Sequence, residues 1–172
     1  MGPISAEIEI DVPRSRAFAL IADLAWRPSF TDHFISDFRL TRVDSSGLGA
    51  GARFRLVVPP RRLWMDTAIT ELEAPRRIVE RGLGGRGNRV PATTVWRLLE
   101  VPGSLTTVHV SQRIEVSHPL SRAVDAASGT SIRYQRAWRR ALHRLRDLLE
   151  EGASSQQRVA VAGGNPHTTD VP

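Results

Sequence analysis

The stretch SIRYQRAWRRALHRLRDLLEE, residues 131–151, decides the fold of this chain. Its apolar residues recur at intervals of three and four, the spacing that places side chains on one face of an α-helix. They are Tyr134, Ala137, Trp138, Ala141, Leu142, Leu145, Leu148 and Leu149. A stripe that begins with Tyr and Trp is wide, so the predicted helix requires a large apolar surface to pack against.

The strands that precede the helix have to provide that surface. Residues 4–12 alternate between apolar and polar with period two, which predicts a half-buried strand, and Pro13 ends it. Short helices are expected at residues 18–22 and 23–30. Further strands are expected at residues 35–43, 53–58, from 65 to near Ala74-Pro75, 77–83, 92–100 and 105–116, and their spacing suits an antiparallel meander. A curved sheet closed over one long helix commonly leaves a cavity between them.

Composition narrows the class of protein. The 172 residues suit one domain, residues 1–152, followed by a polar tail, residues 153–172, that we expect to be disordered. Cysteine is absent, which excludes disulfides and thiolate chemistry, and lysine is absent, which excludes Schiff bases. No apolar stretch approaches the roughly 18 residues that span a bilayer. We therefore expect a cytoplasmic protein without integral membrane association.

The order of these elements resembles the helix-grip superfamily (SRPBCC), which includes START domains and the major birch-pollen allergen. The resemblance is greatest to the bacterial polyketide cyclase/dehydrase and lipid-transport family. The stretches that carry it are IEIDVP (8–13), FALIAD (18–23), WRPSF (26–30), GAGARF (49–54), EAPRR (73–77), TVWRL (94–98) and LHRLR (142–146). It implies an α+β fold in which a seven-stranded curved antiparallel sheet and two short helices enclose a cavity with the long C-terminal helix.

Strand parity and the helical stripe nominate residues that line the predicted cavity. Val110 and Gln112 share one face of the last strand, and a buried Gln needs partners, either a ligand or a neighbouring side chain. Trp96 and Trp138 are either cavity walls or core residues. Tyr134 either donates to a ligand or packs with its hydroxyl in water. The strands before them add Phe54, Met65 and Thr67.

A catalytic centre is not evident in the sequence. His33 lies beside Asp32 and is a candidate general base, although a histidine in a loop is more often simply solvated. Asp66 and Glu80 look isolated, so we predict no pair of acids for acid/base chemistry. The His and acidic residues have no recognisable metal-ligand spacing. We predict no metal and no cofactor, and we assign no catalytic residue.

Three functions remain open. The first is binding of a hydrophobic small molecule, lipid or polyketide-like, in the cavity that the resemblance implies. The second is a polyketide cyclase/dehydrase of aromatase type acting in the same cavity. The third is binding of an anionic membrane or nucleic acid by Arg residues, which the net charge of +6 permits. It ranks last because these residues form no single stripe, and a homodimer is left open.

Overall fold

The computed structural model describes residues 3–85, 87–102, 105–115 and 129–151. The strands are β1 (Ile4–Ile10), β2 (Ile35–Leu40), β3 (Gly51–Val58), β4 (Arg61–Glu73), β5 (Arg77–Gly84), β6 (Val90–Val101) and β7 (Leu105–Ile114). The helices are α1 (Arg14–Ala22), the 3-10 turn η1 (Leu24–Trp26), α2 (Arg27–Thr31) and α4 (Thr130–Glu150). The predicted tail, and helical turns that the pattern of residues 120–127 would allow, lie outside the described residues.

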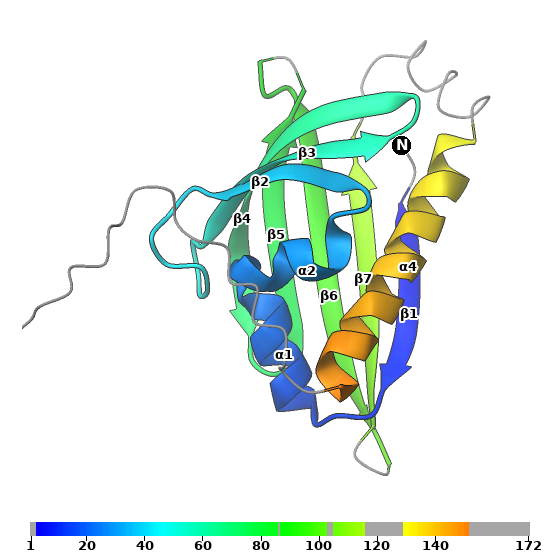
Figure 1. Cartoon of the computed structure of the whole chain (residues 1–172). Coiled ribbons are helices and arrows are strands. Elements are labelled where there is room, and N and C mark those ends of the chain that lie inside the picture. Colours follow the sequence, from blue (N-terminus) through cyan, green and yellow to red (C-terminus); the bar gives the residue numbers. More distant parts are fainter. Residues whose placement is uncertain (1–2, 86, 103–104, 116–128, 152–172) are drawn as a thin grey trace, which may run out of the picture.

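The strands form one antiparallel sheet in the order β1-β7-β6-β5-β4-β3-β2. All neighbours except β1 and β7 are consecutive in the chain, which is the predicted meander with its first strand added beside its last. Figure 1 shows α1, α2 and α4 on the same concave side of this curved sheet, with α4 running beside β1. The predicted α+β helix-grip fold is therefore confirmed.

The α4 helix buries the stripe that the sequence defines. Tyr134, Trp138, Ala141, Leu142 and Leu145 are all buried against the sheet. The helix begins one residue earlier than predicted and is preceded by Gly129, whose φ of 64° is left-handed. Glycine adopts that conformation without strain, so the chain can turn sharply into the helix there.

Two strands differ from their predicted bounds by three residues or more at one end. β4 begins at Arg61 rather than near residue 65, because the segment after Pro59-Pro60 pairs with β3 from its first residue. β2 ends at Leu40 rather than residue 43, and its register with β3 shifts between Ser36 and Arg39. Asp37 lies inside that shift with a positive φ of 54°, a local kink that the polar and apolar pattern does not reveal.

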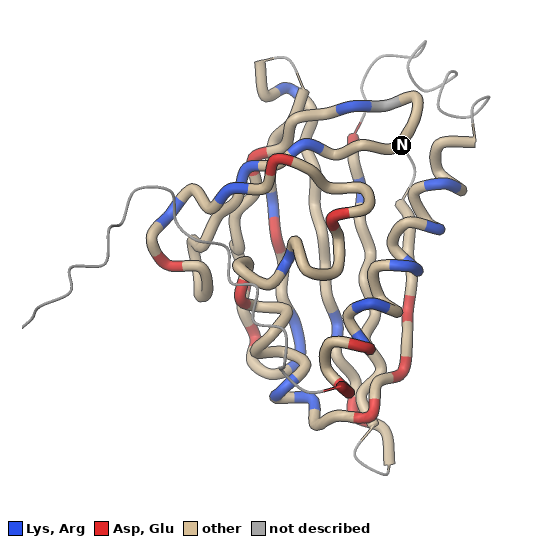
Figure 2. The backbone as a smooth tube through the Cα atoms, in the orientation of Figure 1, with Lys and Arg blue, Asp and Glu red and all other residues tan. Residues whose placement is uncertain are grey.

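Charged residues are spread over the described surface, as Figure 2 shows. The expectation that Arg residues do not gather is wrong for one element, because α4 carries four exposed arginines at Arg133, Arg136, Arg139 and Arg140. Their helical spacing places them opposite the buried stripe. Within the described ranges, no helix is long and apolar enough to cross a membrane.

The packing of α4 against the sheet predicts how single residues of the helix contribute to stability. We expect Leu145→Ala, at a fully buried position, to lower the free energy of unfolding by about 2–5 kcal/mol, because it removes packed methyl groups and leaves a cavity. Leu148→Ala, on the half-buried flank of the same helix, should cost clearly less. Urea denaturation of both variants measures the difference, and equal costs would contradict the packing described.

Candidate functional site

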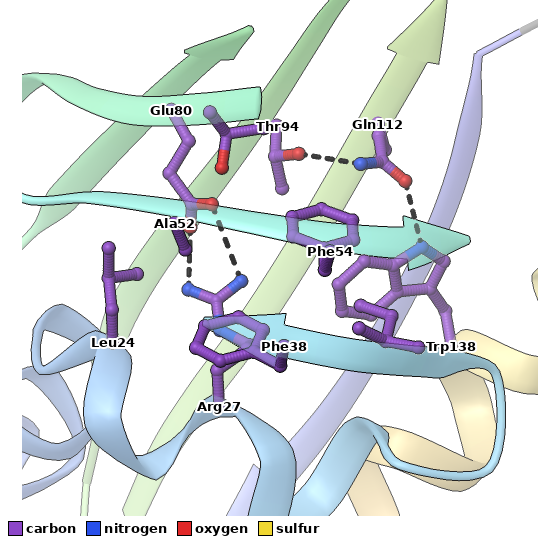
Figure 3. Close-up of a pocket in the computed structure, with 11 residues that line it drawn as sticks. Leu24, Arg27, Phe38, Ala52, Phe54, Glu80, Thr94, Gln112 and Trp138 are labelled. Carbon is purple, nitrogen blue, oxygen red and sulfur yellow. Dashed lines mark hydrogen bonds and ion pairs between the residues drawn. The ribbon is translucent and has the colours of Figure 1, made fainter. Parts of the chain in front are cut away.

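A row of three polar side chains crosses the concave face of the sheet. Glu80 of β5 pairs in register with Thr94 of β6, and Thr94 pairs with Gln112 of β7. Side chains of residues directly opposite on neighbouring strands lie on the same face, and all three are buried. We call Glu80, Thr94 and Gln112 the polar row. Figure 3 shows it spanning the floor beneath the helices.

An ion pair occupies one end of the polar row. The Arg27 guanidinium donates from Nη2 to Glu80 Oε1 at 2.6 Å, while Nη1 lies 3.4 Å from Oε2. Trp96 Nε1 donates to the same Oε1 at 2.8 Å, and the guanidinium lies 5.0 Å from the centre of the Trp96 ring. Arg27 and Glu80 are each only 5% exposed. Burial of two charges requires this pairing, since an isolated ion would lose its hydration without compensation.

A hydrogen-bond network occupies the other end. Gln112 Nε2 donates to Thr94 Oγ1 at 2.8 Å, and Gln112 Oε1 accepts from Trp138 Nε1 at 3.2 Å and from the Tyr134 hydroxyl. The amide thus ties β6 and β7 to α4. Burial raises the pKa of Tyr134 well above its usual range, so the phenol stays protonated and acts as a donor.

One narrow gap lies among the described residues between the sheet and the helices. Its lining residues are Leu24, Arg27, Ile35, Phe38, Ala52, Phe54, Thr67, Glu80, Thr94, Gln112 and Trp138. The volume left among them is about 10 Å³, room for roughly one water molecule. Figure 3 shows the aromatic side chains of Phe38, Phe54 and Trp138 around the same gap as the polar row. Within the described residues, a narrow gap with a polar wall lies where the hollow is predicted.

The nine residues nominated from the sequence fall into three groups. Phe54, Thr67, Gln112 and Trp138 border the gap. Trp96 and Tyr134 lie behind it and hold Glu80 and Gln112, so the expectation that the Tyr134 hydroxyl meets water is wrong. The remaining three do not border the gap; they are Met65 and Val110, which are buried in the core, and His33.

The sequence reasoning missed Arg27 and Glu80. Glu80 was interpreted as an isolated acid, but it shares the inward face of β5 with Ile78, two residues earlier, and strand parity could have placed it there. Arg27 precedes the buried Phe30 by three residues, which puts both on one face of α2. Strand parity cannot predict the ion pair between Arg27 and Glu80, because the two residues are 53 positions apart in the chain.

His33 joins the start of β2 to α4 instead of facing the gap. Its Nε2 lies 3.0 Å from the Ala137 carbonyl oxygen and its Nδ1 lies 3.3 Å from Arg144 Nη1. A carbonyl only accepts and a guanidinium only donates, so the ring is neutral with its proton on Nε2. Arg144 also pairs with Asp32, and that hydrogen bond lowers the pKa of the Asp32 carboxyl. This geometry gives His33 a positioning role and no free nitrogen for catalysis.

The described residues contain no group of three or more His, Cys, Asp or Glu side chains that could hold a metal ion. Inside the gap the chemistry therefore rests on one ion pair, two hydroxyl groups, an amide and an indole N–H, surrounded by aromatic rings. Such a surface can orient an apolar molecule through its oxygen atoms.

The curved sheet, the terminal helix and the enclosed polar gap define a helix-grip protein. The sequence matches the family described as polyketide cyclase/dehydrase and lipid transport over residues 1–150, and the chain belongs to that family. No curated protein matches the sequence significantly.

Several solved structures share the fold at low sequence identity. A protein from Thermus thermophilus superposes with a TM-score of 0.68 at 17% identity, covering 89% of this chain and 99% of that one. A START superfamily protein from Mycobacterium smegmatis gives 0.57 at 12% identity, covering 84% and 99%. DynU16, assigned to the dynemicin biosynthetic locus, gives 0.58 at 14% identity, covering 87% of this chain but 48% of that protein. Identities this low establish a common fold.

Breaking the buried ion pair should be costly. We expect Arg27→Met to lower the free energy of unfolding by about 3–5 kcal/mol, because the Glu80 charge remains buried without its partner. Arg27→Met combined with Glu80→Met should recover part of that loss, although Trp96 Nε1 then lacks its acceptor at a cost of about 1–3 kcal/mol. Arg81→Met, at an exposed pair with Glu71, serves as the control and should cost less than about 1 kcal/mol. Urea denaturation measures all three variants. An Arg27→Met variant that loses no more free energy of unfolding than the control would contradict the pairing.

The His33 contacts predict a pH dependence of stability. Burial, reinforced by Arg140 and Arg144, lowers the pKa of His33 below its ordinary value of 6.5. The unfolded chain therefore binds this proton at a higher pH than the folded protein does. The contribution to stability is complete above about pH 6.5 and falls as the pH drops from there toward the lowered pKa.

Urea denaturation between pH 8 and about pH 5 tests this sign. His33→Gln should flatten the decline, since its amide can donate to Ala137 without titrating. His143→Gln, at an exposed position on α4, should keep the wild-type slope. A wild-type stability that rises on acidification through this window would be the opposite of the expected result.

Proposed function

We propose that this protein binds a hydrophobic small molecule between the sheet and α4, in contact with the polar row. The observation that carries the proposal is the polar row itself, a line of hydrogen-bonding groups set into an aromatic interior. Ligand sites typically combine an apolar lining with a few placed polar groups that fix orientation. The family to which the chain belongs, described by polyketide cyclisation and lipid transport, supports the same class of ligand.

A ligand larger than one water requires the gap to open. Phe38 borders the gap, is half-buried, and stacks on Phe54 with ring centres 5.9 Å apart and planes 13° apart. It belongs to β2, which lies at the edge of the sheet and has a register shift at this point. An edge strand has one neighbour to hold it, so rotation of Phe38 outward disturbs the least structure. We infer that ligand access lies at β2.

The test compares two neighbouring threonines on opposite faces of β6. Thr94→Leu fills the gap and removes the middle of the polar row, so it should weaken binding of the fluorescent ester methyl anthracene-9-carboxylate at least about tenfold, a loss of roughly 1.4 kcal/mol. Thr93→Leu makes the same change on the outer face and should leave the affinity unchanged. Both are measured by fluorescence titration, with circular dichroism as a check on folding.

The control variant Thr93→Leu also tests an alternative binding site. Thr93 borders a surface depression on the outer side of the sheet together with Asp66, Arg81 and Leu83. If Thr93→Leu weakened binding and Thr94→Leu did not, the interior site would be rejected in favour of that depression. No detectable binding of this probe by the wild type would count against the proposed function as stated.

A second function, polyketide cyclase/dehydrase, gains support from Glu80 and Tyr134. The sequence offered no two titratable groups on the inward face, whereas both of these are buried there. In an intramolecular aldol condensation, a carboxylate such as Glu80 can accept a proton from the methylene between two ketones. The carbanion attacks a ketone carbon while a phenol such as Tyr134 hydrogen-bonds to the ketone oxygen in place of Gln112. Glu80 returns its proton to that oxygen, then takes the second methylene proton and passes it to the departing hydroxyl, which leaves as water.

The enzyme hypothesis is tested separately from binding. Wild-type protein incubated with a synthetic poly-β-ketone thioester should yield a cyclised product lighter by one water, detected by mass spectrometry. Tyr134→Phe should abolish that product while keeping affinity for the anthracene ester. Equal product with and without protein would leave binding alone as the function.

A further inference from the structure

The charges around the gap balance one to one. Of the eleven residues that line it, Arg27 and Glu80 are the only ones with charged side chains, and they are paired with each other. The described lining of the gap therefore has no surplus charge for an ionic ligand to neutralise. We propose that the ligand of this site is an uncharged molecule that carries acceptor oxygens, such as a ketone, ester or quinone, and that the site excludes carboxylates, including free fatty acids. This inference rests on the proposed function.

A carboxylate would be unfavourable for a specific reason. To meet a cation in the gap it would have to share Arg27 with Glu80, which places two buried carboxylates beside one guanidinium. Like charges brought together in a medium of low dielectric constant repel strongly, and each ion also loses its hydration. The alternative is displacement of Glu80, which would remove the acceptor of Trp96 Nε1 as well.

A neutral oxygen finds suitable donors in the same place. Arg27 Nε is buried and has no hydrogen-bond partner within the part of the chain that the structure describes. Arg27 Nη1 is also weakly used, since its distance of 3.4 Å to Glu80 Oε2 exceeds that of a good hydrogen bond. A carbonyl oxygen can accept from a guanidinium N–H without disturbing the pair with Glu80. Uncharged ligands with such oxygens gain this bond at no electrostatic cost.

The expected preference for an uncharged ligand is the opposite of what the net charge of the protein favours. The sequence carries a net charge of +6, which attracts anions to the surface in general. A preference for a neutral ligand over its anionic counterpart therefore has to originate inside the site. This preference therefore distinguishes binding inside the site from non-specific association with the charged surface.

The experiment uses two probes that share one ring system. Methyl anthracene-9-carboxylate is neutral, and anthracene-9-carboxylate is its anion at pH 7.5. Fluorescence titration of the wild type should give a dissociation constant at least about tenfold lower for the ester. Glu80→Gln keeps the shape of the side chain and frees the Arg27 charge, so it should reverse the preference and bind the carboxylate more tightly. Arg27→Met should bind the carboxylate even more weakly than the wild type does.

The outcomes separate the two proposals. A carboxylate that binds the wild type as tightly as the ester overturns the uncharged-ligand inference while leaving an interior binding site intact. A Glu80→Gln variant that folds, by circular dichroism, and keeps the wild-type preference overturns it too. If neither probe binds the wild type, the proposed function fails, and this inference fails with it. The wild-type comparison alone is decisive should Glu80→Gln not fold.

Discussion

The polar row at the centre of the concave face is buried, and the side chains around it are arranged to satisfy its polar groups. Each group in it has to be satisfied by the protein, because an unpaired buried polar atom costs about 1–3 kcal/mol and an unpaired charge costs more. Glu80 obtains Arg27 from α2 and Trp96 from β6, while Gln112 obtains Tyr134 and Trp138 from α4. The helices α2 and α4 are thereby positioned over the sheet by polar contacts as well as by packing.

The fold could be predicted from local periodicities, since those that fall within the described residues are retained in the structure. The stripe on residues 131–151 became α4, and the alternating runs became strands, because both patterns report which side of an element faces the core. An irregular backbone conformation within β2 was not predicted. The kink at Asp37 depends on backbone conformation, which apolar and polar patterning does not encode.

The site could be predicted only where its residues belong to a periodic element. Gln112 and Trp138 were found because a polar or aromatic residue stood out in an apolar stripe. Arg27 and Glu80 were missed because each has an unremarkable neighbourhood in the sequence, and their meaning comes from a contact between α2 and β5. The small volume of the gap could not be predicted from the sequence either. It depends on the rotamers of Phe38, Phe54 and Trp138 together.

The most direct test of the account observes the indole N–H groups of the tryptophans during ligand titration. Trp96 and Trp138 donate into the polar row, whereas Trp64 lies on the outer face of the sheet between Arg53 and Arg55. In nitrogen-15 correlation spectra, methyl anthracene-9-carboxylate should shift the Trp96 and Trp138 signals and leave Trp64 in place. Shifts confined to Trp64, or no shift at saturating ligand, would contradict an interior binding site.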